Sequence, residues 1–144
     1  MPDIVGGYTY LTGRTPLPQL WTLGYHQSRW GYDSADCIKK VAGKYRELDM
    51  PCDTMHFDID YMDGYRVFTW NEKDYGDPAG TIQELADDGF KAVCIIDPGV
   101  KLDPGYEKYD EGIAGDYFAK TPEGEVYVNA VWPGDSVYPD FGQP

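Results

Sequence analysis

Short apolar runs bounded by turn-forming residues occur three times in the first part of the chain. They cover residues 20–26, 53–60 and 91–96, and runs of this length predict buried strands. The third run is uninterrupted by polar residues after Lys91, as expected of a parallel strand that is buried on both faces. The second run differs because it ends in acidic residues, at the carboxyl end of its strand.

Between these strands, apolar residues recur at three- and four-residue spacing, which predicts two helices. Ser34, or Asp33 before it, can cap the first helix, and Pro51 ends it. Asp77 followed by a proline starts the second helix, and Gly89 suits its C-terminal end. The apolar faces consist of Ile38, Val41, Ala42, Tyr45 and Leu48 in the first helix and of Ile82, Leu85 and Ala86 in the second.

The order strand, helix, strand, helix, strand is that of a βαβαβ unit. It predicts an α/β fold with a parallel sheet and right-handed crossovers. The remainder of the chain follows a different pattern. Residues 97–141 show no long helix, only a hairpin whose turn lies at residues 121–124, between segments 116–120 and 125–128. A connection of about 45 residues inside a compact domain is usually functional.

Composition narrows the class of protein. A chain of 144 residues suits one globular domain, and 42% hydrophobic and 15% aromatic residues exclude a disordered acidic tail. The 17 glycines and 11 prolines are too many for a helical bundle. Aromatic rings beside carboxylates suit a sugar site, because rings stack on the apolar faces of a pyranose and carboxylates accept hydrogen bonds from hydroxyls. The alternative is that the rings are ordinary core residues.

Charge and cysteine content exclude several partners. Asp and Glu number 25 against 12 Lys and Arg, a formal charge of −13, and the excess lies after residue 50, so we expect no nucleic-acid partner. No apolar run approaches the roughly 18 residues of a membrane span, and the start of the chain lacks a signal-peptide pattern. Three cysteines without CxxC spacing argue against a disulfide framework or a zinc site, and we expect buried thiols.

The densest candidate chemistry follows the second predicted strand. Asp58 and Asp60 are expected to share a strand face, and Asp63 follows in the loop. The carboxyl ends of parallel strands are where α/β sheets place their sites, and these carboxylates could bind sugar hydroxyls or a hard cation. Two alternatives remain: a metal centre that combines His56 with the aspartates, and a solvated acidic loop. GxGxxG, P-loop and GxSxG motifs are absent.

Four ordered motifs resemble glycoside hydrolase family 31, which contains α-glucosidases and related enzymes acting on α-linked sugars. The first covers residues 23–32 (LGYHQSRWGY), and the second combines residues 51–53 (PCD) with residues 56–64 (HFDIDYMDG). The third is IDPGV at residues 96–100, and the fourth is VWPG at residues 131–134 with PDF at residues 139–141. Residues 7–13 (GYTYLTG) resemble the stretch that leads into this family's barrel.

The resemblance implies a partial (β/α)8 TIM barrel that contains about the first three βα units, with a long loop after the third strand. Residues 1–18 would then be a linker, and residues 19–144 the N-terminal portion of the catalytic barrel domain. A complete barrel takes about 250 residues, so this length cannot close one. We therefore expect a fragment whose partner is the rest of the barrel, and whose outer strands are open edges that promote association.

The resemblance also assigns substrate-binding residues in the −1 subsite, the pocket for the sugar that is cleaved off. Asp58 would accept hydrogen bonds from sugar hydroxyls, while apolar and aromatic side chains shape the pocket. Relatives specific for xylosides tend to carry an aromatic residue at the position of Asp60, so the aspartate indicates an α-glucoside or α-linked oligosaccharide as substrate. The implied residues are Trp30, Asp58, Ile59, Asp60, Ile96 and Trp132.

Members of this family are retaining enzymes that use two catalytic carboxylates. The nucleophile belongs to a Trp-x-Asp-Met-Asn-Glu-Pro-like motif on the fourth strand, which this sequence lacks, and the acid/base comes later. The resemblance therefore implies a chain with substrate-binding residues but no catalytic residue, metal or cofactor. A noncatalytic carbohydrate-binding or interaction module remains the alternative.

Overall fold

The computed structural model describes residues 1–142 of the chain. The first half contains the helix α1 (Pro2–Thr12), the 3-10 turn η1 (Leu20–Leu23), the strand β1 (His26–Gln27), the helix α2 (Ala35–Glu47), the strand β2 (Thr54–Phe57) and the 3-10 turns η2 (Ile59–Tyr61) and η3 (Asp63–Tyr65). The second half contains α3 (Glu72–Tyr75), α4 (Pro78–Asp87), β3 (Lys91–Cys94), β4 (Val100–Lys101), α5 (Glu107–Ala114), β5 (Val128–Val131) and β6 (Gly134–Val137).

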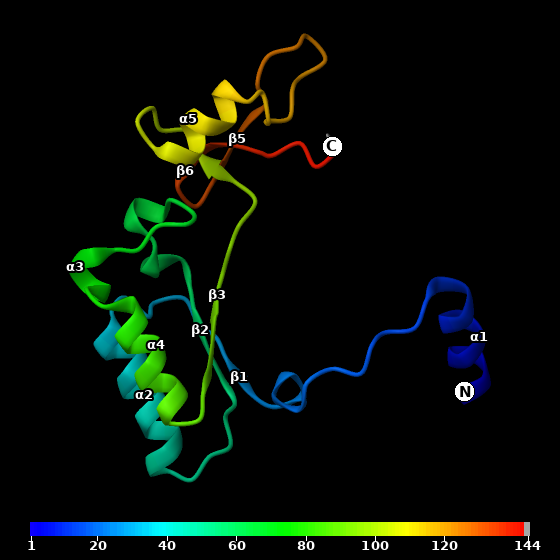
Figure 1. The fold of residues 1–144 in the computed structure, drawn as a ribbon, viewed down its shortest axis with the longest axis vertical. Coiled ribbons are helices and arrows are strands. Elements are labelled where there is room, and N and C mark those ends of the chain that lie inside the picture. The colour runs from blue at the N-terminus through cyan, green and yellow to red at the C-terminus, as the bar shows by residue number, and fades with distance from the viewer. Residues whose placement is uncertain (143–144) are drawn as a thin grey trace.

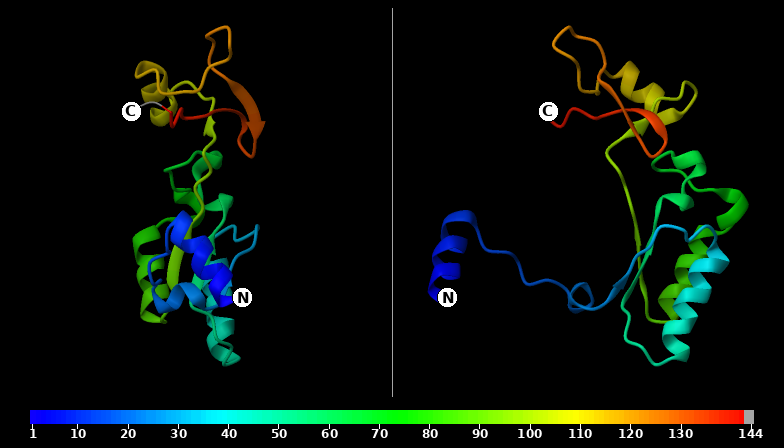
Figure 2. Two further views of the ribbon diagram at one scale, coloured as in Figure 1. Left: turned by 90° about the vertical axis from the view of Figure 1, so that its right-hand side faces the viewer. Right: turned by 180° about the vertical axis from the view of Figure 1, so that it is seen from behind.

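The strands β1, β2 and β3 form a parallel sheet in that order, which confirms the predicted βαβαβ unit. Met55 of β2 lies opposite Ala92, and Phe57 lies opposite Cys94. The helices α2 and α4 lie side by side on one face of this sheet (Figure 1). Within residues 1–142 no element covers the other face, as Figure 2 shows from behind.

Both predicted N-caps of the long helices are confirmed. Ser34 Oγ accepts a hydrogen bond from the backbone N–H of Cys37 at 3.2 Å, and Asp77 Oδ1 accepts one from the backbone N–H of Gly80 at 2.9 Å. Such bonds satisfy backbone donors that lack a partner in the first turn. The C-terminal end of α2 differs from the prediction, because the helix ends at Glu47 and Leu48 is 61% exposed.

The strands are shorter than predicted. Residues 20–26 are not a buried strand, because Leu20–Leu23 form the exposed turn η1 and β1 begins only at His26. β2 stops at Phe57 because Asp58 N-caps η2, its Oδ1 accepting a hydrogen bond from the backbone N–H of Ile59 at 2.7 Å. The prediction that Asp58 and Asp60 share a strand face is therefore wrong.

The third strand is also not buried on both faces. β3 ends at Cys94, its first residue is exposed and the next three are half-buried. Ala92 and Cys94 pack against the core, whereas Ile95 and Ile96, beyond the strand, are 37% and 56% exposed. The cause is the uncovered face of the sheet (Figure 2).

Residues 97–141 contain more regular structure than the sequence predicted. β4, β6 and β5 form an antiparallel sheet in that order, and the helix α5 lies against it (Figure 1). The predicted turn is confirmed, since the backbone N–H of Gly124 donates to the carbonyl of Thr121 at 2.9 Å and Lys120 bridges Val126. The sequence did not predict the helix α5. This helix is short, and its N-cap residue, Tyr106, makes no capping side-chain bond.

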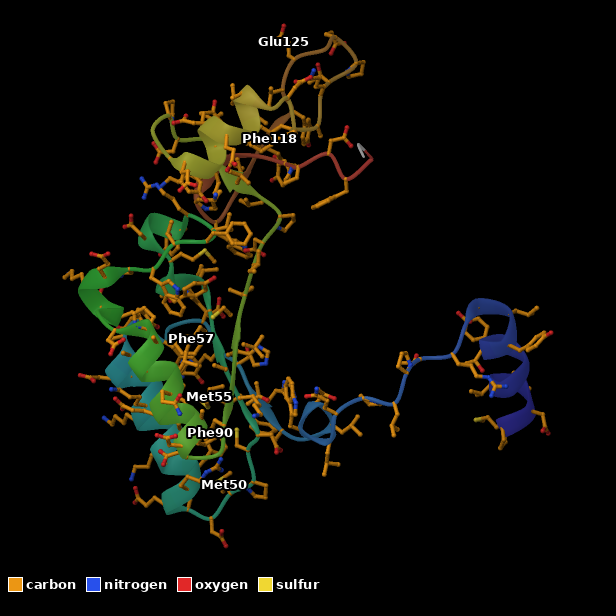
Figure 3. The ribbon with its side chains drawn as sticks, in the orientation of Figure 1. Met50, Met55, Phe57, Phe90, Phe118 and Glu125 are labelled. Atoms are coloured by element: carbon orange, nitrogen blue, oxygen red, sulfur yellow. The ribbon has the colours of Figure 1, made fainter. Side chains whose placement is uncertain are left out.

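The core begins between the parallel sheet and its two helices and continues into the antiparallel region, where Val100, Phe118 and Val137 are buried. Met55 and Phe57 of β2 are fully buried, and Phe90 packs beside them (Figure 3). The guanidinium of Arg46 lies 3.7 Å from the centre of the Phe90 ring, a cation–π contact that closes the lower end of this core. Other members of the buried cluster are Ile38, Ala42, Tyr61, Tyr75, Leu85, Val100, Tyr106, Phe118 and Val137.

The N-terminal segment stands apart from this core. Within residues 1–18, the expected linker, Pro2–Thr12 form the helix α1, which has no buried residue. An extended stretch separates α1 from β1 (Figure 1).

Of the cysteines, Cys52 is buried as expected, whereas Cys37 and Cys94 are half-buried, and all three are free thiols. Among residues 1–142, no helix has the length and apolar character that crossing a membrane requires.

Gly43 in α2 and Gly112 in α5 form a matched test of the packing of α5. A Cβ at position 43 meets nothing within 4 Å, whereas a Cβ at position 112 overlaps the buried ring of Phe118. We expect Gly43→Ala to raise the free energy of unfolding by about 0.5–1 kcal/mol, because alanine favours a helix. Gly112→Ala should lower it by about 1–3 kcal/mol, because the core is overpacked. Urea unfolding measures both, and stabilisation by Gly112→Ala would contradict the packing of Phe118.

Candidate functional site

A pocket of about 370 Å³ lies at the carboxyl ends of the parallel strands. Each wall follows a different element: Trp30 follows β1, Asp58 and Ile59 follow β2, and Ile95 follows β3. The fifth wall residue, Trp132, comes from the turn between β5 and β6. Parallel α/β sheets bind ligands at this edge, and here the antiparallel hairpin adds one side chain to it.

Four of the six residues assigned to the sugar pocket line it together, namely Trp30, Asp58, Ile59 and Trp132. Ile96 does not, and its neighbour Ile95 takes that place. Successive side chains along an extended segment alternate between its faces. Since Ala92 and Cys94 pack on the core, odd-numbered residues there face the other way, and Ile95 continues this pattern just beyond β3.

Asp60 also lies outside the pocket lining. It is half-buried within η2, and its charge is one of the influences that raise the pKa of Tyr75, after burial of that phenol. Asp60 is displaced because Asp58 starts a 3-10 turn, in which residues two apart do not share a face. Within residues 1–142, Asp58 is therefore the one pocket-lining residue that carries a carboxylate.

The chemistry of the pocket is aromatic with a single acid. Trp30 and Trp132 are 68% and 64% exposed, so each indole presents open apolar surface. Asp58 is half-buried, and Oδ1 is engaged with the backbone N–H of Ile59, whereas Oδ2 accepts no hydrogen bond from residues 1–142. A ligand with an apolar face and hydroxyl groups can use both features.

A hydrogen bond from η2 supports the wall that follows β3. The hydroxyl of Tyr61 donates to the carbonyl of Ile95 at 2.9 Å. Burial, together with the nearby Cys94 and Asp97, raises the pKa of Tyr61 to about 12, so the hydroxyl keeps its proton for this bond. Asp97, which follows this wall, has a buried Oδ2 without a hydrogen-bond partner within the described residues.

The two histidines of the chain meet beneath the pocket. His26 Nδ1 lies 3.1 Å from His56 Nε2, and His26 Nε2 lies 3.3 Å from the carbonyl oxygen of Trp21. The indole of Trp21 stacks on the ring of His26 with 5.9 Å between ring centres. Sequence reasoning missed this pair, because only the pairing of β1 with β2 brings residues 30 positions apart together.

Burial lowers the pKa of His56 from its ordinary value, and the neighbouring His26 lowers it further, while the charge of Asp58 acts in the opposite direction. His56 therefore favours its neutral form in the folded chain. The metal alternative joined His56 to the aspartates, but within residues 1–142 no group of three or more His, Cys, Asp or Glu side chains is placed to hold a metal ion.

Comparison with known proteins gives a consistent set of relatives. The family model described as the glycosyl hydrolases family 31 TIM-barrel domain matches residues 15–144. Alpha-glucosidase 2 of Bacillus thermoamyloliquefaciens is 48% identical over 139 residues, covering 96% of this chain and 18% of the relative. Neutral alpha-glucosidase AB of Mus musculus is 41% identical over 143 residues, with 99% and 15% covered. The chain thus spans less than a fifth of the length of these relatives.

Solved structures agree with the curated relatives. The structure of an ER glucosidase II heterodimeric complex matches with a TM-score of 0.92 and 39% identity, covering 99% of this chain and 16% of that one. A family 31 alpha-glucosidase from Bacteroides thetaiotaomicron matches with a TM-score of 0.88 and 39% identity, with 99% and 24% covered. A DNJ-bound structure of the glucosidase II alpha subunit matches with a TM-score of 0.90 and 40% identity, with 96% and 15% covered.

The lowered pKa of His56 predicts how the stability of the chain depends on pH. The unfolded chain takes up the proton first, near the ordinary histidine pKa of about 6.5. The contribution of His56 is therefore fully present above that pH and is lost as the pH falls through the lower pKa of the folded chain. We expect the free energy of unfolding in urea to fall between about pH 7.5 and about pH 5.

The control for this prediction is His56→Gln, which cannot titrate. Carboxylates titrate in both proteins, so the difference between wild type and variant isolates the histidine. We expect the variant to lose less stability over the same pH range. Parallel curves for the two proteins would contradict the lowered pKa of His56.

Proposed function

Because this chain belongs to glycosyl hydrolase family 31, we propose that it forms the substrate-binding part of a retaining glycoside hydrolase that cleaves α-glucosidic bonds. The residues proposed to hold the sugar are Trp30, Asp58, Ile59 and Trp132, with Ile95 in the role that the sequence assigned to Ile96. Asp60 remains a proposed substrate-binding residue only for a part of the sugar that extends beyond the pocket lining.

The observation that carries the proposal is the combination of two exposed indoles with one carboxylate in a single pocket. A pyranose has apolar C–H faces and equatorial hydroxyls, so it needs both a ring to stack on and an anionic acceptor. The relatives named as alpha-glucosidases, at 41–48% identity over almost the whole chain, point to an α-glucoside as the sugar.

We further propose that the parallel sheet forms about the first three βα units of a (β/α)8 barrel, with residues 1–18 as a linker and residues 19–144 as barrel. Three parallel strands with helices on one face support this arrangement, as does the uncovered opposite face (Figure 2), which would become the inner face of the barrel. The strands that complete the barrel would cover β1 and β3 at the open edges of the sheet.

Retaining glycosidases hold two carboxyl groups about 5–5.5 Å apart, one on each side of the scissile bond. The described pocket has one carboxylate, that of Asp58. The nucleophile and the acid/base of the proposed enzyme therefore come from other strands of the barrel, and this chain supplies binding residues. Glycoside hydrolysis of this type requires no metal or organic cofactor.

The single carboxylate also suits the alternative, a carbohydrate-binding module without turnover. The two functions differ in whether the whole protein hydrolyses a sugar, whereas neither of them predicts hydrolysis by the chain alone. We expect the purified 144-residue chain not to hydrolyse p-nitrophenyl α-glucoside, because neither catalytic carboxylate is present. Release of nitrophenol is followed by absorbance, and enzyme-level turnover by the chain alone would contradict the assignment of the missing carboxylates.

Asp58 provides the test of the sugar site within the whole enzyme. We expect Asp58→Asn to lower kcat/KM for an α-glucoside by about 100-fold or more, because sugar hydroxyls lose an ionised acceptor. The asparagine oxygen can still accept the hydrogen bond from the backbone N–H of Ile59, so the turn η2 keeps its cap. The matched control is Asp87→Asn, an exposed acid at the end of α4. Equal activity of the two variants would refute the role of Asp58.

A further inference from the structure

We propose that the pair His26 and His56 is a positioning element of the sugar pocket: its N–H···N hydrogen bond fixes β1 against β2 and thereby sets the distance between the walls Trp30 and Asp58. The role in sugar binding rests on the proposed function. The positioning of Trp30 does not, because it is a property of the chain without ligand.

The hydrogen-bond partners assign the protons of this pair. A carbonyl oxygen only accepts, so His26 Nε2, at 3.3 Å from the carbonyl of Trp21, carries a hydrogen. Neutral His26 then has an unprotonated Nδ1, which accepts a hydrogen bond from His56 Nε2–H across 3.1 Å. The ring centres are 5.4 Å apart, the sum expected when the two nitrogens face each other along the line of centres. The hydrogen bond therefore has its donor, His56, on β2 and its acceptor, His26, on β1.

The bond joins the two strands that lead into the walls formed by Trp30 and Asp58. His56 is two residues before Asp58, and His26 is four residues before Trp30. β1 has only two residues and pairs with one strand among residues 1–142, with His26 opposite Thr54 and Gln27 opposite Met55. A strand of this length makes few backbone hydrogen bonds to its neighbour. A side-chain hydrogen bond on the uncovered face of the sheet therefore contributes a large part of what holds β1 in place.

The other face of β1 is fixed separately. The amide of Gln27 donates to the hydroxyl of Tyr32 at 2.6 Å and accepts from the hydroxyl of Tyr45 at 2.5 Å, which ties β1 to α2. These bonds hold Gln27 against α2 and do not involve the side chain of His26. The histidine pair, on the opposite face, adds a side-chain bond between β1 and β2 and thereby restrains the chain that leads to Trp30.

Amide side chains allow a test that separates positioning from simple packing. The oxygen of asparagine lies at about the position of histidine Nδ1, and the nitrogen of glutamine at about the position of Nε2. His26→Asn with His56→Gln therefore keeps an acceptor facing a donor. The exchanged double variant, His26→Gln with His56→Asn, has the same composition. Its amide groups, however, lie at the wrong distance from the backbone to match Nδ1 of His26 and Nε2 of His56. A purely space-filling role makes the two double variants equivalent.

The first measurement is the NMR signal of the Trp30 indole N–H in the ligand-free chain, assigned with Trp30→Phe. We expect the matched double variant to keep the wild-type position of this signal and the exchanged variant to shift or broaden it. Labelled imidazole nitrogens of the wild type should show a coupling across the hydrogen bond between His26 Nδ1 and His56 Nε2. Equal Trp30 signals in the two double variants, or a wild type in which His26 Nδ1 carries the hydrogen or shows no coupling to His56 Nε2, would overturn the proposal.

The second measurement is calorimetric titration with maltose. We expect the exchanged variant to bind about tenfold or more weakly than the matched variant, because a displaced ring loses its stacking geometry.

The two measurements fail separately. A chain that binds no maltose in any form contradicts a sugar site formed by this chain alone, while the Trp30 signal still decides whether the pair positions that wall. Sugar affinities that are equal in the two double variants, with a wild type that binds, contradict the positioning role and leave the proposed function standing.

Discussion

Burial of Met55 and Phe57 against α2 and α4 determines how the rest of the structure is oriented. Side chains alternate along a strand, so these two positions force His56 onto the opposite, uncovered face. A shift of one residue would exchange the faces and place an imidazole in the core. β2 is also the central strand and pairs with β1 and β3 on either side. The core and the edge that carries the pocket are therefore consequences of the same register.

Features with a local cause could be predicted from the sequence. Ser34 and Asp77 cap their helices through bonds to backbone groups three residues on, and the chemistry of both caps is visible in the sequence. The cap formed by Asp58 is local as well, but it lay inside a run that alternation suggested was a strand. An aspartate followed by an apolar residue suits either structure. The hydrogen bond to Ile59 N–H is what ends β2, and it moved Asp60 away from the pocket.

The remaining parts of the site depend on the fold as a whole. Whether Ile95 or Ile96 lines the pocket is decided by which face of β3 meets the core, and an apolar run without polar interruptions carries no such information. The contact of His26 with His56 requires the pairing of two strands. The length of β1 depends on which neighbours complete the sheet. The family motifs nevertheless brought Trp30 and Trp132 together, since they encode spatial relations that periodicity does not.

Trp132 reaches the pocket from a hairpin whose strands belong to a different sheet from the other walls. Two bonds anchor the region that carries this hairpin, and both lie away from the hairpin turn. Arg66 Nε donates to Asp103 Oδ2 at 2.9 Å, and Lys101 Nζ donates to the carbonyl of Gly64 at 3.0 Å. The turn can therefore change in length or sequence without altering any parallel strand. The hairpin is therefore a structurally separate source of one pocket wall, which can be redesigned while the three parallel strands keep their pairing.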